Sequence, residues 1–512
     1  MSRSMSTSHD EQRRSVAWDV SAGPRNYVTL VMTQAASSFS ALVTIWLLTR
    51  LLGASGYGEI SAIIAAAVLI STAALGWSAM ALARIGCEEF VNTGRITETF
   101  WTRTLILLLN WALVLSTAPL WLHPVTEWLH LTSDGQVLLF VYLGAVSCWG
   151  HIQQALHGVK LQRLLGRLLA AERLLILAGA GLLVLGSASA QKVIMIYAAG
   201  ALATAVFGFW RLRHLIGRPV APEKQLLRRI LIFSLPLIPQ SLVSYFSTNY
   251  LDAWFILRYL TAADLGVYSI AYQLAGTAMQ LPVLVSSLLL PMFTTLQMQR
   301  GEEQLDGYMR QLLPVLTLGW ALAGTLITGM AVVLLPLLFG AQFAASAQLI
   351  WPLMAASVIA GPMSMGYGPL LNAKSATAAI AAGALAGACA NLLLNLALIP
   401  RWGLLGCAWA TAGSYLVNLL VGAYLLWRLS GLSGSWTLEA VLPLAGGALF
   451  AGITGSQATA FFLTLVSIAG LAFFRRAALR TGGRHLHKFW MNREKGGLGN
   501  PGPYRPSSQE AG

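Results

Sequence analysis

Charged side chains are scarce in this chain of 512 residues, because Asp, Glu, Lys and Arg together make up only 10% of it. Soluble domains carry about 25% charged residues. Hydrophobic residues reach 56%, and a soluble chain of this kind would expose large apolar patches to water. The composition therefore excludes a soluble globular protein and predicts a membrane protein, in agreement with a mean hydropathy of +0.66.

Cysteine is also rare, and the groupings of side chains that mark enzymes and metal sites are missing. The four cysteines lie in or beside apolar segments without CxxC spacing, so we interpret them as small apolar side chains. No Ser/His/Asp set or carboxylate pair is evident, and the stretch 368–375 (GPLLNAKS) lacks the second glycine of a phosphate-binding loop. The sequence thus predicts no enzyme, no catalytic residue, no metal site and no ATP site.

Long apolar runs are abundant. A helix needs about 20 mainly apolar residues to cross a bilayer, and we predict fourteen such spans. Only Gly455 and Ser456 separate the last two of them. The predicted spans are 27–49, 58–83, 104–122, 136–156, 168–189, 193–210, 230–256, 266–296, 312–339, 346–371, 376–399, 404–427, 437–455 and 457–474.

The distribution of Lys and Arg orients these spans. The stretch 1–26 is polar, and the apolar run after it is too long for a cleaved signal peptide, so we interpret it as a retained first span. We then assume that the N-terminus is cytoplasmic. With alternating spans, 29 of the 33 Lys and Arg residues then fall inside and 4 outside, as cytoplasmic loops require. Both termini are predicted to be cytoplasmic. The net charge of +14 follows from this topology, and no nucleic-acid partner is needed to explain it.

A short internal repeat divides the chain. The stretches from 49 (TRLLGASGYGEIS) and from 257 (LRYLTAADLGVYS) lie 208 residues apart and follow the first and the seventh span, so the two halves have the same orientation. Such parallel repeats occur in transporters whose substrate site lies between the halves. We assign their shared residues to turns at the outer surface, where glycine permits close approach or positive φ. The matched pairs are Arg50/Arg258, Leu52/Leu260, Ala54/Ala262, Gly58/Gly266 and Ser61/Ser269.

The predicted fold is therefore an all-α polytopic membrane protein with two parallel-repeat six-helix bundles and a C-terminal helix pair. All loops are short, so the function is expected within the membrane. The predicted segments are a cytoplasmic N-terminus (1–26), a first bundle (27–215), a cytoplasmic linker (216–229), a second bundle (230–428), an additional helix pair (437–474) and a basic, disordered cytoplasmic tail (475–512).

Four stretches resemble a known family. They are 50–61, 233–239 with 252–276, 398–416 (LIPRWGLLGCAWATAGSYL) and, more weakly, 337–353. They are similar to the polysaccharide-transporter branch of the multidrug/oligosaccharidyl-lipid/polysaccharide exporter superfamily, which includes O-antigen flippases. The resemblance implies a V-shaped pair of bundles that alternates between inward-open and outward-open states. It also implies an undecaprenyl-pyrophosphate-linked oligosaccharide as substrate. The first-half spans show few charges where lipid II flippases place arginines, which argues against lipid II.

The seventh predicted span, 230–256, holds the most informative polar groups. Ionisable groups inside a membrane are costly and are functional candidates. The functional interpretation is a polar wall of a central cavity, with Asp252 as a site for H⁺ or Na⁺. The alternative is an ion pair between Asp252 and Arg258 at the interface, with the serines bonded to their own helix. Both remain open for Asp252, and pairing is favoured for Arg258. The candidate residues of this span are Gln240, Ser244, Ser247, Asn249 and Asp252.

Three further residues are candidates outside that span. Gln34 and Gln273 are assigned to the cavity wall. Arg84 lies at the inner end of the second span beside two glutamates, and its forked guanidinium suits the oxygens of a pyrophosphate headgroup. The enrichment of inner loops in Lys and Arg explains most other inner arginines equally well.

The predicted function is a flippase that moves the head of a lipid-linked oligosaccharide from the cytoplasmic to the periplasmic leaflet of a bacterial inner membrane. The product would serve O-antigen, exopolysaccharide or capsule biosynthesis, with membrane lipids and polymerase or export machinery as partners. An ion gradient, the membrane potential or downstream consumption would drive it. The alternatives are a multidrug or lipid II exporter of the same fold, a membrane-embedded polysaccharide polymerase or ligase, and a scaffold that transports nothing.

Overall fold

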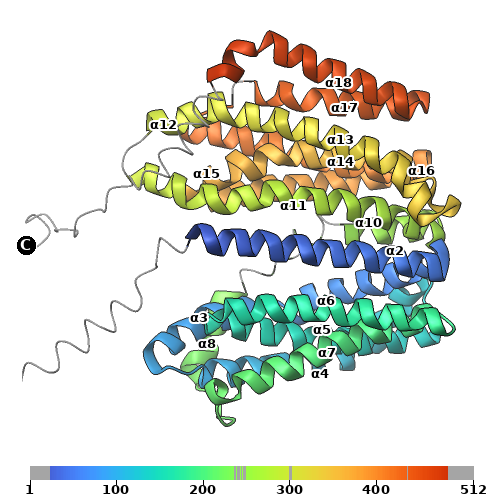
Figure 1. The fold of residues 1–512 in the computed structure, drawn as a ribbon. Coiled ribbons are helices and arrows are strands. Elements are labelled where there is room, and N and C mark those ends of the chain that lie inside the picture. The colour runs from blue at the N-terminus through green and yellow to red at the C-terminus, as the bar shows by residue number, and fades with distance from the viewer. Residues whose placement is uncertain are drawn as a thin grey trace, which may run out of the picture.

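The computed structural model describes residues 23–235, 238, 241, 243, 245, 249–298, 302–434 and 436–481. The regular elements of these residues are helices, and the long ones run side by side, as Figure 1 shows. Within these described residues, ten helical segments are long and apolar enough to cross a membrane. The prediction of an all-α polytopic membrane protein is therefore confirmed.

The helices up to residue 216 form what we call the first half, and a short helix, α8, follows it. The π-helical turn η2 continues α2 before a break at residues 76–78. The elements are α2 (Gly23–Ile70), η2 (Ser71–Leu75), α3 (Ala79–Thr93), α4 (Thr97–Trp128), α5 (Ser133–Gly158), α6 (Gln162–Leu182), η3 (Leu183–Leu185), α7 (Ala190–Ile216) and α8 (Lys224–Ser234).

The second half covers residues 249–430, and two more helices complete the described chain. These last helices are separate, because Gly455 ends the first of them with φ 70°. The elements are α10 (Asn249–Tyr259), α11 (Ala262–Met298), α12 (Glu302–Gly307), η4 (Tyr308–Leu312), α13 (Leu313–Phe339), η5 (Ala341–Phe343), α14 (Ser346–Pro362), η6 (Met363–Tyr367), α15 (Gly368–Ala373), α16 (Thr377–Ser430), α17 (Thr437–Thr454) and α18 (Gln457–Phe474).

Two glycines divide the longest helices. Gly53 in α2 has φ 69° and Gly403 in α16 has φ 55°, a left-handed conformation that glycine adopts without steric cost. The two arms of α16 lie against each other, because a Cβ atom on Gly387 would be 3.1 Å from the carbonyl oxygen of Ser414. Each of these long helices therefore supplies two of the predicted spans.

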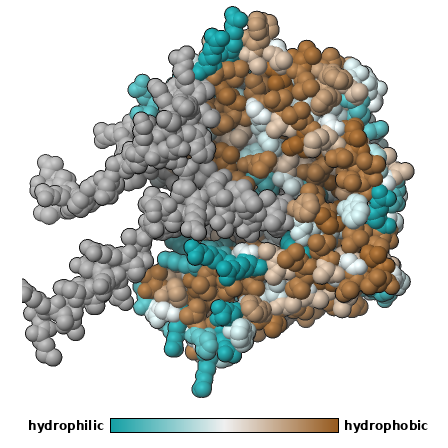
Figure 2. All heavy atoms as spheres, viewed as in Figure 1, coloured by the Kyte–Doolittle hydropathy of each residue, from teal (hydrophilic) through white to brown (hydrophobic). Residues whose placement is uncertain are grey.

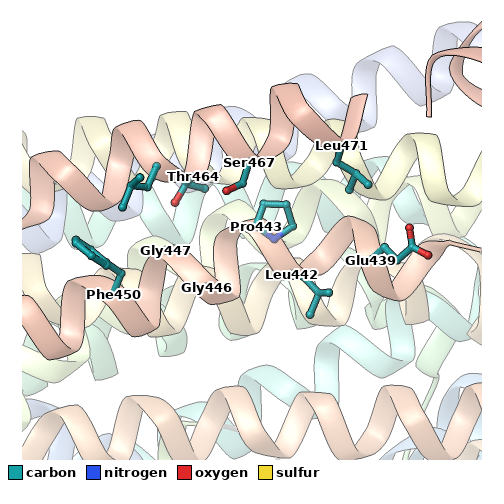
Figure 3. A pocket seen from close by; sticks show the side chains of 10 residues that line it. Glu439, Leu442, Pro443, Gly446, Gly447, Phe450, Thr464, Ser467 and Leu471 are labelled. Atoms are coloured by element: carbon teal, nitrogen blue, oxygen red, sulfur yellow. The ribbon is translucent and has the colours of Figure 1, made fainter. Parts of the chain in front are cut away.

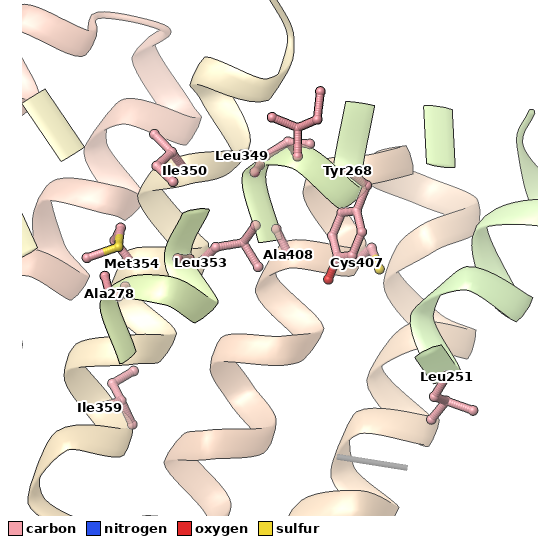
Figure 4. Packing of buried hydrophobic residues seen from close by; sticks show 14 of the residues in the cluster. Leu251, Tyr268, Ala278, Leu349, Ile350, Leu353, Met354, Ile359, Cys407 and Ala408 are labelled. Atoms are coloured by element: carbon pink, nitrogen blue, oxygen red, sulfur yellow. The ribbon is translucent and has the colours of Figure 1, made fainter. Parts of the chain in front are cut away.

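The second half is packed around α14, which α11, α13, α16 and α17 surround. Leu349, Ile350, Leu353 and Met354 of this helix are almost fully buried, and Figure 4 shows them directed at the neighbouring helices. Large apolar side chains also cover the outside. In Figure 2 the described part of the visible face is mostly hydrophobic, with hydrophilic side chains mainly at its margins. This distribution fits a protein whose sides face lipid.

The two halves meet along α2 and α11, which lie side by side (Figure 1). Their closest approach is at Gly58 and Gly266. A Cβ atom on Gly58 would lie 1.7 Å from the carbonyl oxygen of Ala262, and one on Gly266 would lie 2.1 Å from that of Ala54. Small residues allow helix backbones to approach this closely in membranes. The turn role predicted for these two glycines is wrong, since Gly53 is the glycine with positive φ in this region.

We name the two ends of the molecule by these features. The crossing end holds Gly53, the contact between Gly58 and Gly266, and the break at Gly403. The linker end holds α8, which packs Ile230 against Ala81, Ile85 and Ile106 of the first half. In Figure 1 the crossing end lies to the right and the linker end to the left.

Candidate functional site

Asp252 lies inside the second half and is 1% exposed. Three neutral groups donate hydrogen bonds to its carboxylate. The hydroxyl of Tyr268 donates at 2.5 Å, the amide of Asn395 at 2.9 Å and the hydroxyl of Thr411 at 3.2 Å. Figure 4 shows the ring of Tyr268 beside Cys407 of α16. The carboxylate is thus held between α10, α11 and both arms of α16.

The break in α16 brings two of these donors together. Asn395 and Thr411 each lie eight residues from Gly403, on opposite arms of the hairpin. At 1.5 Å per residue both are about 12 Å from the turn, so they reach the same level of the membrane. Asn395 also donates to the side-chain oxygen of Asn391 at 2.9 Å. Tertiary structure therefore adds Tyr268, Asn391, Asn395 and Thr411 to a site of which the sequence indicated only Asp252.

This site is rich in oxygen and has no cationic partner. In the described part of the chain, no Lys, Arg or His side chain forms an ion pair with Asp252. The side-chain oxygen of Asn395 is buried and has no hydrogen-bond partner. Buried acceptors without partners are rare in proteins, and oxygen donors suit hard cations. A proton or a small cation would neutralise the carboxylate and fit this set of donors.

Arg258 does not pair with Asp252. Its guanidinium carbon lies 5.3 Å from the ring centroid of Trp128 in the first half. The two residues are six apart on one helix, so their side chains point about 120° away from each other. The predicted ion pair is therefore wrong, because helix geometry separates the two side chains.

Arg103 and His151 form a buried polar cluster that the sequence interpretation missed. Arg103 is 2% exposed and lies 2.7 Å from Nδ1 of His151. It also donates to the carbonyl oxygen of Leu75, the last residue of η2, at 3.2 Å. Thr104 contacts Nε2 of His151 at 2.9 Å. The cluster supports the break in the second span. The predicted span 104–122 leaves Arg103 in the loop before it, whereas α4 begins at Thr97.

Arg173 is a second intramembrane arginine of the first half. It lies eleven residues after the start of α6, so it is about 16 Å from that end. Its side chain is exposed, and among the described residues its guanidinium has no hydrogen-bond or ion-pair partner, although the neighbouring Glu172 is within electrostatic range. It is within electrostatic range of Tyr142, Tyr197 and Tyr250, which come from α5, α7 and α10. Because α10 belongs to the second half, Arg173 lies where the halves meet.

Glu172 is the neighbour of Arg173 and accepts a hydrogen bond from the indole of Trp149 at 2.9 Å. Together with Arg103 and His151, these residues overturn the expectation that the first-half spans hold few charges. The signal was present, because Glu172 and Arg173 lie within the predicted span 168–189. The argument against a lipid II substrate drawn from missing charges therefore no longer holds.

The other predicted site residues lie apart from these clusters. Arg84 is 3.9 Å from Glu88, which also pairs with Arg229, and lies over the ring of Phe233 at 4.9 Å. It therefore links α3 to α8. Gln273 is exposed on α11. Gln34 lies in α2 and Asn249 begins α10, but their side chains are outside what the structure describes, as are the residues Gln240, Ser244 and Ser247.

A groove of about 550 Å³ lies between α17 and α18, as Figure 3 shows. Its walls are mainly apolar, and Gly446 leaves room because nothing lies within 4 Å of the position of its Cβ atom. Glu439 lies at one end and is paired with Arg475 at 2.6 Å. The residues that line the groove include Leu442, Gly446, Gly447, Phe450, Thr464 and Leu471.

Lipid-facing helices in two halves, with buried polar groups between and within them, define a polytopic membrane protein of the transporter type. The chain belongs to the polysaccharide biosynthesis protein family, which matches residues 24–297. The family resemblance drawn from the repeat and its neighbouring stretches is thereby confirmed.

A curated relative and two solved structures agree with this assignment. The probable low-salt glycan biosynthesis flippase Agl15 of Haloferax volcanii is 23% identical over 250 residues, which is 48% of this chain and 52% of that protein. The chain thus spans about half the length of this relative. The lipid II flippase MurJ in an inward closed conformation has a TM-score of 0.62 at 12% identity. The alignment covers 87% of this chain and 99% of the MurJ chain.

An inward-facing multidrug resistance MATE family transporter of the MOP superfamily has a TM-score of 0.55 at 14% identity. The alignment covers 80% of this chain and 95% of that one. At these identities the two solved structures show a shared fold, so the predicted fold of the superfamily is confirmed.

Proposed function

We propose that this protein is a flippase for a lipid-linked glycan and acts in polysaccharide biosynthesis. The family match carries the proposal, and Arg173 gives it a chemical basis, because an unpaired arginine in mid-membrane is costly and calls for an anionic ligand. The proposed cargo is a glycan on undecaprenyl pyrophosphate, moved to the outer leaflet for a surface polysaccharide. Alternating opening of the two ends would move the headgroup.

The residues around Arg173 suit such a headgroup. The guanidinium presents a planar fork that matches phosphate oxygens. Tyr142, Tyr197 and Tyr250 add aromatic faces and hydroxyl groups, which pack against sugar rings and form hydrogen bonds with sugar hydroxyls. The groove between α17 and α18 offers an apolar surface along which a prenyl chain stays in lipid while its head moves.

We further propose that Asp252 couples this movement to a cation, H⁺ or Na⁺. A carboxylate among neutral donors in an apolar surrounding is stabilised when it binds a positive charge. Because Asn395 and Thr411 lie on opposite arms of α16, a cation bound here would hold α10 and both arms in one arrangement. Binding and release would thus bias the second half between two packings.

We place the protein in a bacterial inner membrane with the linker end in the cytoplasm. Most Lys and Arg residues would then lie in cytoplasmic loops. The crossing end, with Arg50, Lys192, Arg258 and Arg401, would face the periplasm.

Flipping of a labelled polyprenyl-pyrophosphate oligosaccharide in proteoliposomes tests the proposal. The purified protein should move the label across the bilayer, and Arg173→Gln should slow this at least roughly tenfold, since it removes a charged hydrogen-bond donor. Arg173→Lys should be intermediate, because it keeps the charge without the fork. Arg401→Gln, on the exposed surface of the crossing end, is the matched control. If the protein does not flip the glycan lipid but flips lipid II or exports a cationic drug, the proposal is wrong and that alternative takes its place.

A further inference from the structure

The duplicated motif of the two halves meets its partner at the crossing end. Arg50 donates to the carbonyl oxygen of Leu338 at 2.7 Å and to that of Leu337 at 3.0 Å. Trp46 donates to Leu338 as well, at 2.9 Å. These carbonyls are at the C-terminus of α13, where backbone oxygens lack helical partners and the helix dipole attracts a positive charge. Arg50 therefore caps α13, which contains the third predicted span of the other half.

The second copy of the motif makes the reciprocal contact. Arg258 lies over the ring of Trp128, the last residue of α4, and α4 contains the third predicted span of the first half. The indole of Trp128 donates to the carbonyl oxygen of Trp254 at 2.8 Å. Nε2 of His130 lies 3.2 Å from the carbonyl oxygen of Leu257. The repeat extends to the tryptophans, because Trp46 and Trp254 are also 208 residues apart. Each copy thus contacts the end of the helix that contains the third predicted span of the opposite half.

The contact between Gly58 and Gly266 lies between these two copies of the motif. Both backbones are in contact there, so the halves are as close as helices can be. A further polar contact joins the halves nearby, because the amide of Ala54 donates to the side chain of Gln342 at 3.3 Å. The two copies of the motif differ here. Thr261, the counterpart of Gly53, donates from its amide and its hydroxyl to the carboxylate of Asp264 in its own half.

We propose that this duplicated motif is a latch that keeps the crossing end closed, and that both arginine contacts must break before this end opens. We define the latch as Trp46, Arg50, Gly58, Trp254, Arg258 and Gly266 with their partners on α4 and α13. Its two copies are nearly symmetric, so each adds to the stability of the closed end, and loss of both has the largest effect. The inference rests on the proposed alternating opening of the two ends, and it does not depend on which lipid is carried.

Spin-label distances between the halves test the latch without substrate. In full-length protein with its native cysteines replaced by alanine, labels at Asp134→Cys and Arg401→Cys report on the crossing end. Labels at Arg95→Cys and Arg428→Cys report on the linker end. With Arg50→Ala and Arg258→Ala combined, the ratio of long to short distances at the crossing end should rise, and at the linker end it should fall.

Each arginine is expected to change this ratio roughly three- to tenfold, which corresponds to the loss of one charged contact near the surface. Arg50→Lys should act less than Arg50→Ala, because lysine lacks the fork that reaches two carbonyls. Lys192→Ala removes a positive charge at the same end. The hydrogen bonds of the Lys192 ammonium group in the described chain go to Ser187, in the loop before its own helix, so this variant should leave both distances unchanged.

Three results would overturn the latch. They are unchanged distances in the double variant, an equal effect of Lys192→Ala, and an equal broadening of both label pairs, which would indicate general loosening. Flipping assays on the same proteins separate this inference from the proposed function. If the distances respond but no glycan lipid is flipped, the latch stands and the cargo is wrong.

Discussion

Replacing Gly58 by alanine adds one methyl group at the closest backbone approach between the two halves. The new Cβ atom would lie 1.7 Å from the carbonyl oxygen of Ala262, whereas Cβ atoms essentially never come within 3.0 Å of another heavy atom. The helices α2 and α11 must then separate by about 1.3 Å, since the obstacle is backbone and not a flexible side chain. We expect Gly58→Ala to destabilise the state in which the crossing end is closed.

The size of the effect follows from the contacts that this separation weakens. A gap of this size removes much of the dispersion attraction between facing atoms. It also stretches the hydrogen bonds from Arg50 and Ala54 to the second half, which are 2.7 to 3.3 Å long. Losing contacts of this kind costs about 2–4 kcal/mol in total, so the closed state should become roughly 30- to 1000-fold less favoured.

Hydrogen exchange of the protein in nanodiscs measures this change. The amides of 50–60 and 258–266 should exchange faster in Gly58→Ala, by a factor that follows the population of the open state. Gly150→Ala is the matched control, because nothing lies within 4 Å of its Cβ position and alanine favours a helix. Exchange equal to the wild type at both segments, in a variant that still folds, would refute the argument from close approach.

Three further predictions concern the sites within the halves. Asp252→Asn should abolish the dependence of flipping on an H⁺ or Na⁺ gradient, whereas Thr411→Ser, which keeps the hydroxyl donor, should retain it; gradient-dependent rates of both variants decide this. Arg103→Met leaves Nδ1 of His151 and a backbone carbonyl without the guanidinium, so it should lower the free energy of unfolding by about 2–4 kcal/mol, and a wild-type midpoint in thermal unfolding would contradict this. Gly446→Trp fills the groove between α17 and α18 and should raise the concentration of long-chain substrate needed for half-maximal flipping roughly tenfold, but should leave a short-chain analogue unaffected in the same assay.

The helices that cross the membrane were predictable because hydropathy and length act locally. Each described span overlaps a predicted one, and α17 and α18 were separated correctly by Gly455. The ends of the helices were less predictable. Apolar windows stop where polar residues begin, but α4 and α6 continue several residues further, because helices extend beyond the apolar core of the bilayer. That difference placed Arg103 in a loop, although it is buried.

The polar sites depended on contacts that no local pattern contains. Asp252 was a candidate because a carboxylate in a span is unusual, whereas Asn395 and Thr411 became its partners through a hairpin at Gly403. Asp252 and Arg258 are close in sequence, yet the helix turns them apart. Arg84 was selected by its position near the inner surface, and its contacts with α8 were not readable from that position.

The sequence by itself determined the membrane class, the helical spans, the duplication and the family, since these depend on composition, local hydropathy and the order of motifs. Tertiary structure alone decided what the duplicated residues do. Gly58 and Gly266 are 208 residues apart and were expected to form two separate turns, but they lie against each other. Only the packing of α2 on α11 brings them together, because contact between distant segments is set by the whole fold.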